Sequence, residues 1–153
     1  MMAFRRRYIR DDQRGTAAIE MALIAPVLAT LLVGMVDIGR GYSIKLLLEQ
    51  ASQRAIEKVM NGQADKTTAA ALKTEAATVA GVPEENVTID FWLECADVRQ
   101  ASYASTCNSG VTYRRYLTVA IIKTFSPIFA TRWAGANADG TYTISGKTGV
   151  RTQ

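Results

Sequence analysis

Residues 16–36 form an apolar run, and no other feature constrains the fold of this 153-residue chain as strongly. Glu20 is the single charged residue within the run. A helix of this length, at about 1.5 Å per residue, measures roughly 30 Å, which matches the hydrocarbon core of a bilayer. Because residues 21–36 show no polar face, the run favours a retained membrane helix over the buried helix of a soluble domain.

A cleaved secretory signal peptide is a further alternative, because basic residues also precede such peptides. Glu20 argues against it, since a charge falls inside the apolar region. Residues 36–40 also offer no cleavage site of the small-x-small type. A single membrane helix remains the interpretation that the residues favour.

The excess of basic over acidic residues lies almost entirely in front of the apolar run. Five arginines and two aspartates in residues 1–15 account for +3 of the formal net charge of +4. Such segments stay on the cytoplasmic side of a membrane helix. We therefore expect residues 1–15 to be a cytoplasmic leader, residues 16–36 to span the membrane, and the rest to lie on the far side. The nearly neutral remainder does not favour nucleic acid as a partner.

Three features inside the run bear on helix packing. Pro26 has no N–H, so the carbonyl of Ala22 loses its donor and a kink is predicted there. Glu20 either extends toward Arg14 at the membrane interface or pairs with a cationic group that another chain supplies. Small side chains on one face let membrane helices approach closely, although alanine is common enough for such a stripe to arise by chance. The stripe consists of Ala18, Ala22, Ala25 and Ala29.

Helical periodicity continues beyond the span. Residues 37–62 are predicted to form an amphipathic continuation of the same helix, stopped by Asn61-Gly62. A second helix is expected over residues 66–80, opened by Asp65 and closed by Gly81. The apolar positions are Ile44, Leu48, Ala51, Ala55 and Val59 in the first helix, and Ala69, Leu72, Ala76 and Val79 in the second.

The pattern then changes to the alternation typical of strands. Three antiparallel strands are expected, over residues 87–94, 116–125 and 141–150. Residues 116–125 are apolar at nearly every position, which is typical of a central strand. Strands that follow two helices predict an α+β fold, with residues 63–153 as a head domain.

The two cysteines and the absence of histidine limit the chemistry. Cys95 and Cys107 bracket a polar loop, and a disulfide between them would stabilise the head by roughly 3 kcal/mol in the chain-entropy model. An oxidising compartment favours the disulfide, and two free thiols are the alternative. Without histidine, Ser-His-Asp and Cys-His catalysis and imidazole zinc sites are excluded. We expect no catalytic residue, no metal and no cofactor.

Residues 14–20, Arg-Gly-Thr-Ala-Ala-Ile-Glu, resemble the class-III signal of type IV pilin-like proteins. Residues 14–40 as a whole, together with the segments 116–119 and 124–129 and the closing strand, resemble the TadE-like pseudopilins of tight-adherence (Flp-type) pili. The resemblance implies that a prepilin peptidase cuts between Gly15 and Thr16. It also implies that Glu20 pairs with the free α-amino group of Thr16 on a neighbouring subunit. Met21 departs from the aromatic residue that many such signals carry after the glutamate.

The resemblance implies a minor pseudopilin that assembles or primes a Tad/Flp-type pilus. Its expected partners are the bacterial inner membrane, other pilin or pseudopilin subunits, the prepilin peptidase and the Tad secretion machinery. The head would be periplasmic, and the processed chain would join a cell-surface pilus or act only in its assembly. The alternative is an unprocessed, single-pass membrane-anchored binding or sensor module with a periplasmic head. An anchored enzyme has little support.

Overall fold

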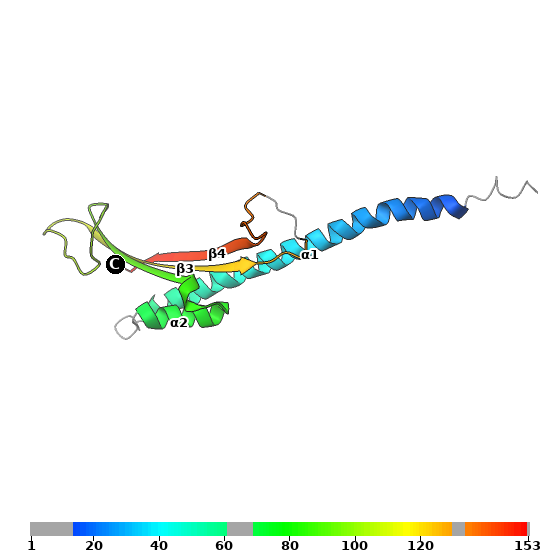
Figure 1. The fold of residues 1–153 in the computed structure, drawn as a ribbon. Helices are drawn as coiled ribbons and strands as arrows, with labels where there is room; N and C mark the ends of the chain where they lie inside the picture. The colour runs from blue at the N-terminus through cyan, green and yellow to red at the C-terminus, as the bar shows by residue number, and fades with distance from the viewer. Residues whose placement is uncertain (1–13, 61–68, 130–133, 153) are drawn as a thin grey trace, which may run out of the picture.

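The computed structural model describes residues 14–60, 69–129 and 134–152. Helix α1 (Arg14–Lys58) is continuous over 45 residues and joins the apolar run to the head without a break (Figure 1). Its N-terminal half projects away from the rest of the chain, and its second half lies along the sheet. The predicted continuation of the helix beyond residue 36 is therefore confirmed. The expected stop at Asn61-Gly62 lies outside the described residues.

Helix α2 (Ala69–Ala80) packs beside α1. It ends at Gly81, whose φ of 61° is left-handed. The Gly81 N–H bonds to the Thr78 carbonyl and the Val82 N–H to the Ala77 carbonyl, which are the paired bonds of a Schellman cap. The predicted apolar face of this helix is buried at Leu72 and Ala76, as expected, but Ala69 is exposed. The expected start, with Asp65 as the cap, lies outside the described residues.

In the part of the chain that the structure describes, the sheet has four antiparallel strands instead of the expected three. A short 3-10 turn, η2 (Glu84–Asn86), leads into β1 (Val87–Cys95), which is followed by β2 (Val98–Arg99), β3 (Tyr113–Phe125) and β4 (Tyr142–Arg151). The strand order is β2-β1-β3-β4.

The unexpected strand β2 forms because the chain reverses directly after β1. Ala96 and Asp97 make the two-residue turn, with φ of 49° and 63°. A hairpin turn of this kind needs positive φ at both positions, for which Asn-Gly is the usual signal. Ala-Asp carries no such signal, and two residues are too few to show alternation.

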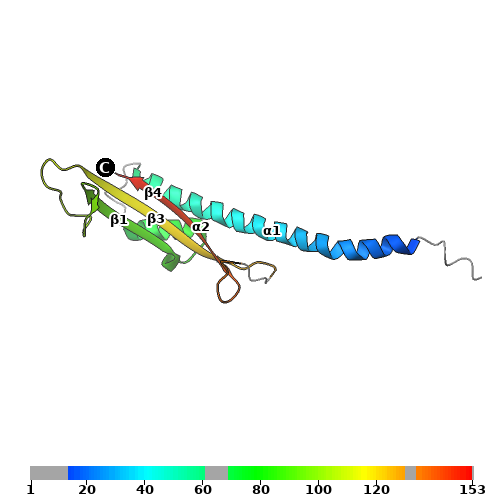
Figure 2. The same cartoon turned by 90° about the horizontal axis from the view of Figure 1, so that it is seen from above.

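Both helices cover the same face of the sheet, α1 against β3 and β4, and α2 against β1 (Figure 2). The core lies between these layers and includes Leu48, Ala51, Ala55, Ala76, Val87, Leu117, Val119 and Ile121. Strand β3 is central, as predicted. Its alternate positions face away from the helices, however, and Ile122 is 43% exposed. The apolar side chains of β3 are therefore buried on the face toward the helices, and those on the opposite face are not.

The backbones of α1 and β4 come unusually close at Gly146. A Cβ placed on Gly146 would lie 2.5 Å from the Leu48 carbonyl carbon and 2.7 Å from the Glu49 nitrogen. Beside this contact, the hydroxyls of Ser52 and Thr148 are hydrogen-bonded at 2.6 Å. Only glycine fits at this point in the strand, since the helix backbone cannot give way as a flexible side chain can.

We expect Gly146→Ala to destabilise the head. Overpacking of this kind costs about 1–3 kcal/mol, and the upper end is expected here because a backbone is in the way. The free energy of unfolding is measured by denaturant titration of the full chain in nonionic detergent, followed by near-UV circular dichroism. Gly149→Ala is the matched control in the same strand, since its added methyl comes no closer than 3.3 Å to any neighbour, the Thr118 hydroxyl being the nearest atom. Equal stability of the two variants would contradict the prediction.

Candidate membrane-spanning and assembly segment

The N-terminal half of α1 presents apolar side chains that the chain itself does not cover. Every residue from 15 to 32 is exposed. The helix is long and apolar enough to cross a membrane, and none of its most apolar stretch is buried. Soluble monomers rarely expose an apolar surface of this extent. The exposed side chains include Ile19, Met21, Leu23, Ile24, Val27, Leu28, Leu31 and Leu32.

The residues of the expected cleavage site lie in the first turn of α1. Gly15 and Thr16 are exposed, and Glu20 follows one turn later, also exposed. Among the described side chains, none forms an ion pair with Glu20. The Arg14 side chain lies outside the described part of the chain. Cleavage at this point and pairing of Glu20 both stay predictions.

The alanine stripe lies on a helical stretch, as its spacing requires. Ala18, Ala22, Ala25 and Ala29 are all exposed on α1, so this face is free of the head. The helix continues through Pro26, and the Thr30 hydroxyl donates to the Pro26 carbonyl at 2.7 Å. Packing through the stripe and a kink at Pro26 stay predictions.

Asp37, the first charged residue after the apolar run, has a role that no local sequence pattern indicates. Its carboxylate accepts the Ile128 N–H, at 3.0 and 2.9 Å to its two oxygens, and the Phe129 N–H at 3.1 Å. Arg40 forms an ion pair with it at 3.2 Å, and the guanidinium lies 5.2 Å from the centre of the Phe125 ring. Asp37 therefore ties the segment after β3 to α1.

This environment lowers the pKa of Asp37 below its ordinary value of 3.8. The hydrogen bond from the Ile128 N–H is the largest cause, because it favours the ionised carboxylate. Loss of water around the group opposes this effect, whereas the Phe129 N–H and Arg40 lower the pKa further. The arrangement holds a negative charge at the point where α1 enters the head.

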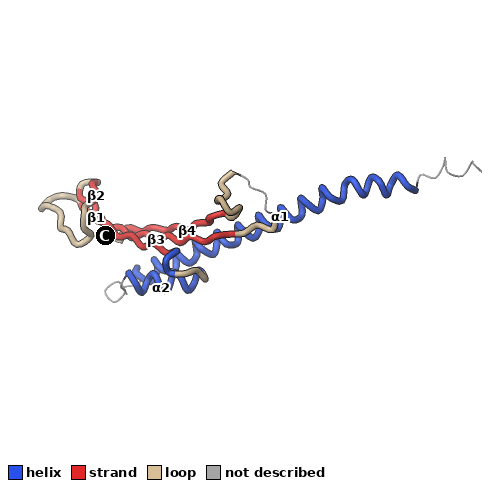
Figure 3. Tube along the Cα trace, in the orientation of Figure 1, coloured by secondary structure: helices blue, strands red, loops and turns tan. Residues whose placement is uncertain are grey.

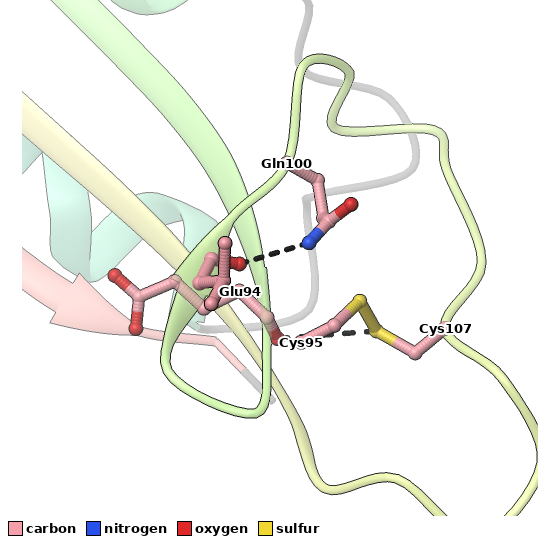
Figure 4. Close-up of a disulfide and its surroundings, with 5 residues drawn as sticks. Glu94, Cys95, Gln100 and Cys107 are labelled. Atoms are coloured by element: carbon pink, nitrogen blue, oxygen red, sulfur yellow. Dashed lines mark hydrogen bonds between the residues drawn. A yellow bond between two sulfur atoms is a disulfide. The ribbon is translucent and has the colours of Figure 1, made fainter.

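The predicted disulfide between Cys95 and Cys107 is confirmed. Figure 4 shows Cys95, at the end of β1, joined to Cys107 in the following loop. Their Cα atoms are 5.7 Å apart, which is an ordinary separation for a disulfide. The Gln100 amide bonds to the Val98 carbonyl at 3.0 Å within the same loop. The loop after β2, which contains Cys107, lies at the end of the head that is remote from the N-terminal half of α1 (Figures 1 and 3).

We expect acid to remove the stability that Asp37 provides. Because its folded-state pKa is lowered, the ionised group stabilises the fold at neutral pH, and this contribution is lost as pH falls through that lowered pKa. Denaturant unfolding of the full chain in nonionic detergent, from neutral pH down to about pH 2, measures the effect. Asp37→Asn should be less stable than the parent at neutral pH, and the difference should shrink in acid. A difference that stays constant would contradict this role.

Comparison with known proteins gives one match, in the N-terminal part of the chain. Residues 15–56 match the family model described as TadE-like protein. No curated protein and no solved structure matches the chain. The matched segment begins at Gly15 and ends within the part of α1 that packs on the sheet. The resemblance to TadE-like proteins is therefore confirmed over residues 15–56.

Proposed function

We propose that this chain is a minor pseudopilin that assembles or primes a Tad/Flp-type pilus after cleavage by a prepilin peptidase. The observation that carries the proposal is the exposed apolar surface of α1 over residues 15–32. This segment lies within the TadE-like match. The basic leader supports a cytoplasmic N-terminus, with residues 16–36 crossing the inner membrane and the head in the periplasm.

The exposed N-terminal half of α1 suits a subunit that moves from the membrane into a fibre. In the membrane, lipid covers the apolar side chains of residues 16–36. In a fibre, the same side chains pack against neighbouring subunits, and the alanine stripe permits close approach. Because α1 is continuous, a neighbour that holds the N-terminal half also sets the position of the head. These properties support a structural role in assembly over a catalytic role.

Glu20 is the residue that we assign to pairing between subunits. A carboxylate in an apolar environment is costly unless a positive charge neutralises it. Cleavage after Gly15 would create such a charge, the α-amino group of Thr16. Pairing across subunits would place this amine beside the exposed Glu20 of a neighbour.

We expect the purified mature chain to begin at Thr16. The full chain is expressed with a prepilin peptidase, extracted from membranes and measured by intact mass spectrometry. The control is Gly15→Val, which should remain uncut. An added Cβ at Gly15 meets no atom within 4 Å, so the variant is not expected to disturb the fold. An N-terminus at Met1 or Met2 in the parent chain would instead support the unprocessed anchored sensor module.

We expect Glu20→Ala to be cleaved normally but to enter pili at least tenfold less than the parent chain. Loss of one member of a buried charge pair costs about 3–5 kcal/mol, which exceeds the roughly 1.4 kcal/mol of a tenfold change. Immunoblots of sheared pili against the membrane fraction give the ratio. Glu57→Ala is the matched control, because Glu57 is an exposed glutamate on the same helix beyond the span. Normal incorporation of Glu20→Ala would refute the pairing while leaving cleavage untouched.

A further inference from the structure

The segment that Asp37 holds carries exposed apolar side chains. We call residues 126–129, Ser-Pro-Ile-Phe, the apolar loop. Ile128 is 61% exposed and Phe129 is 40% exposed, although the backbone N–H groups of both are bonded to Asp37. The sequence has no charged residue between Lys123 and Arg132. The backbone of the apolar loop is thus held in place while its side chains face outward.

The apolar loop lies level with the end of the proposed membrane span. Asp37 directly follows that span, and its carboxylate is about 3 Å from the Ile128 and Phe129 nitrogens. Figure 3 shows the loop after β3 running along α1 toward the N-terminal half of the helix. Val33 and Gly34 are already half-buried, whereas residues 15–32 are exposed. Burial of α1 by the rest of the chain therefore begins within the last turn of the span.

Exposed side chains on the turns of α1 that follow the span match the chemistry of a lipid interface. Ile38 is 75% exposed and Tyr42 is 64% exposed on the next turns of α1. The Arg40 side chain is 49% exposed, so its guanidinium is accessible beside the Phe125 ring. Aromatic residues and arginine with apolar neighbours are typical of the boundary between headgroups and acyl chains.

We propose that the apolar loop is a second membrane contact, in which Ile128 and Phe129 enter the headgroup region of the bilayer beside the end of the span in α1. Arg40 then lies at the level of the lipid phosphates. The inference rests on the proposed membrane span. It adds that the head is held against the membrane surface through two points instead of turning freely about α1. A subunit that leaves the bilayer must release both contacts.

Quenching by spin-labelled lipids tests this proposal on the full chain. Ile128→Cys is labelled with the fluorophore NBD without reductant, so the Cys95–Cys107 disulfide stays closed. The protein is placed at one copy per phosphatidylcholine/phosphatidylglycerol nanodisc, which removes contacts between copies. Lipids that carry a nitroxide near the headgroup should quench this label severalfold more than lipids that carry it near the chain end.

Two further labelled variants provide the controls. Met60→Cys matches the exposure of Ile128, at 59%, but lies roughly 35 Å further along the helix axis, so its label should not be quenched. Val27→Cys lies within the span, and deep nitroxides should quench its label. Equal quenching at positions 128 and 60, with Val27 quenched, would overturn the proposal. So would a blue-shifted but unquenched label at position 128, which would indicate a protein surface. An unquenched label at Val27 would refute the span itself, and the loop contact with it.

Discussion

The close packing of α1 on strands β3 and β4 is the contact on which the head depends. Leu48, Ala51 and Ala55 form the buried face of the helix, and Gly146 lets the β4 backbone approach it. The small residues bring main chains together, so the hydroxyl pair of Ser52 and Thr148 lies within the contact. Strand β1 and helix α2 complete the core on the same face of the sheet, toward its β1–β2 edge.

This packing gives one continuous helix two different surroundings. Residues 15–32 are exposed to their surroundings, whereas the part of the helix after them is buried along one face by the sheet and α2. Asp37 lies where the two halves meet, and main-chain N–H groups surround its carboxylate together with Arg40. A charge satisfied in this way can remain ionised next to an apolar segment. It also fixes the part of the head that is nearest to the proposed membrane.

The opposite end of the head is secured by different means. The Cys95–Cys107 disulfide closes the loop that follows the short β1–β2 hairpin. On the uncovered face of the sheet, Trp92 stacks on Tyr116 with ring centres 5.0 Å apart, and the Arg99 guanidinium lies 4.9 Å from the Trp92 ring. Aromatic and cationic side chains thus cover sheet surface that no described helix reaches.

The sequence by itself determined the features that depend on neighbours along the chain. The apolar run, the buried positions Leu48, Ala51 and Ala55, and three of the four strands follow from periodicity, because a solvent boundary imposes a period of 3.6 or 2 on local residues. The pairing of the disulfide could be predicted because the chain has only two cysteines. Tertiary structure alone decided that Asp37 bonds to Ile128, 91 residues away, and that Gly146 lies against Leu48. Backbone N–H groups carry no side-chain signature, and a close approach depends on how whole elements pack, so neither contact can be seen in a local pattern.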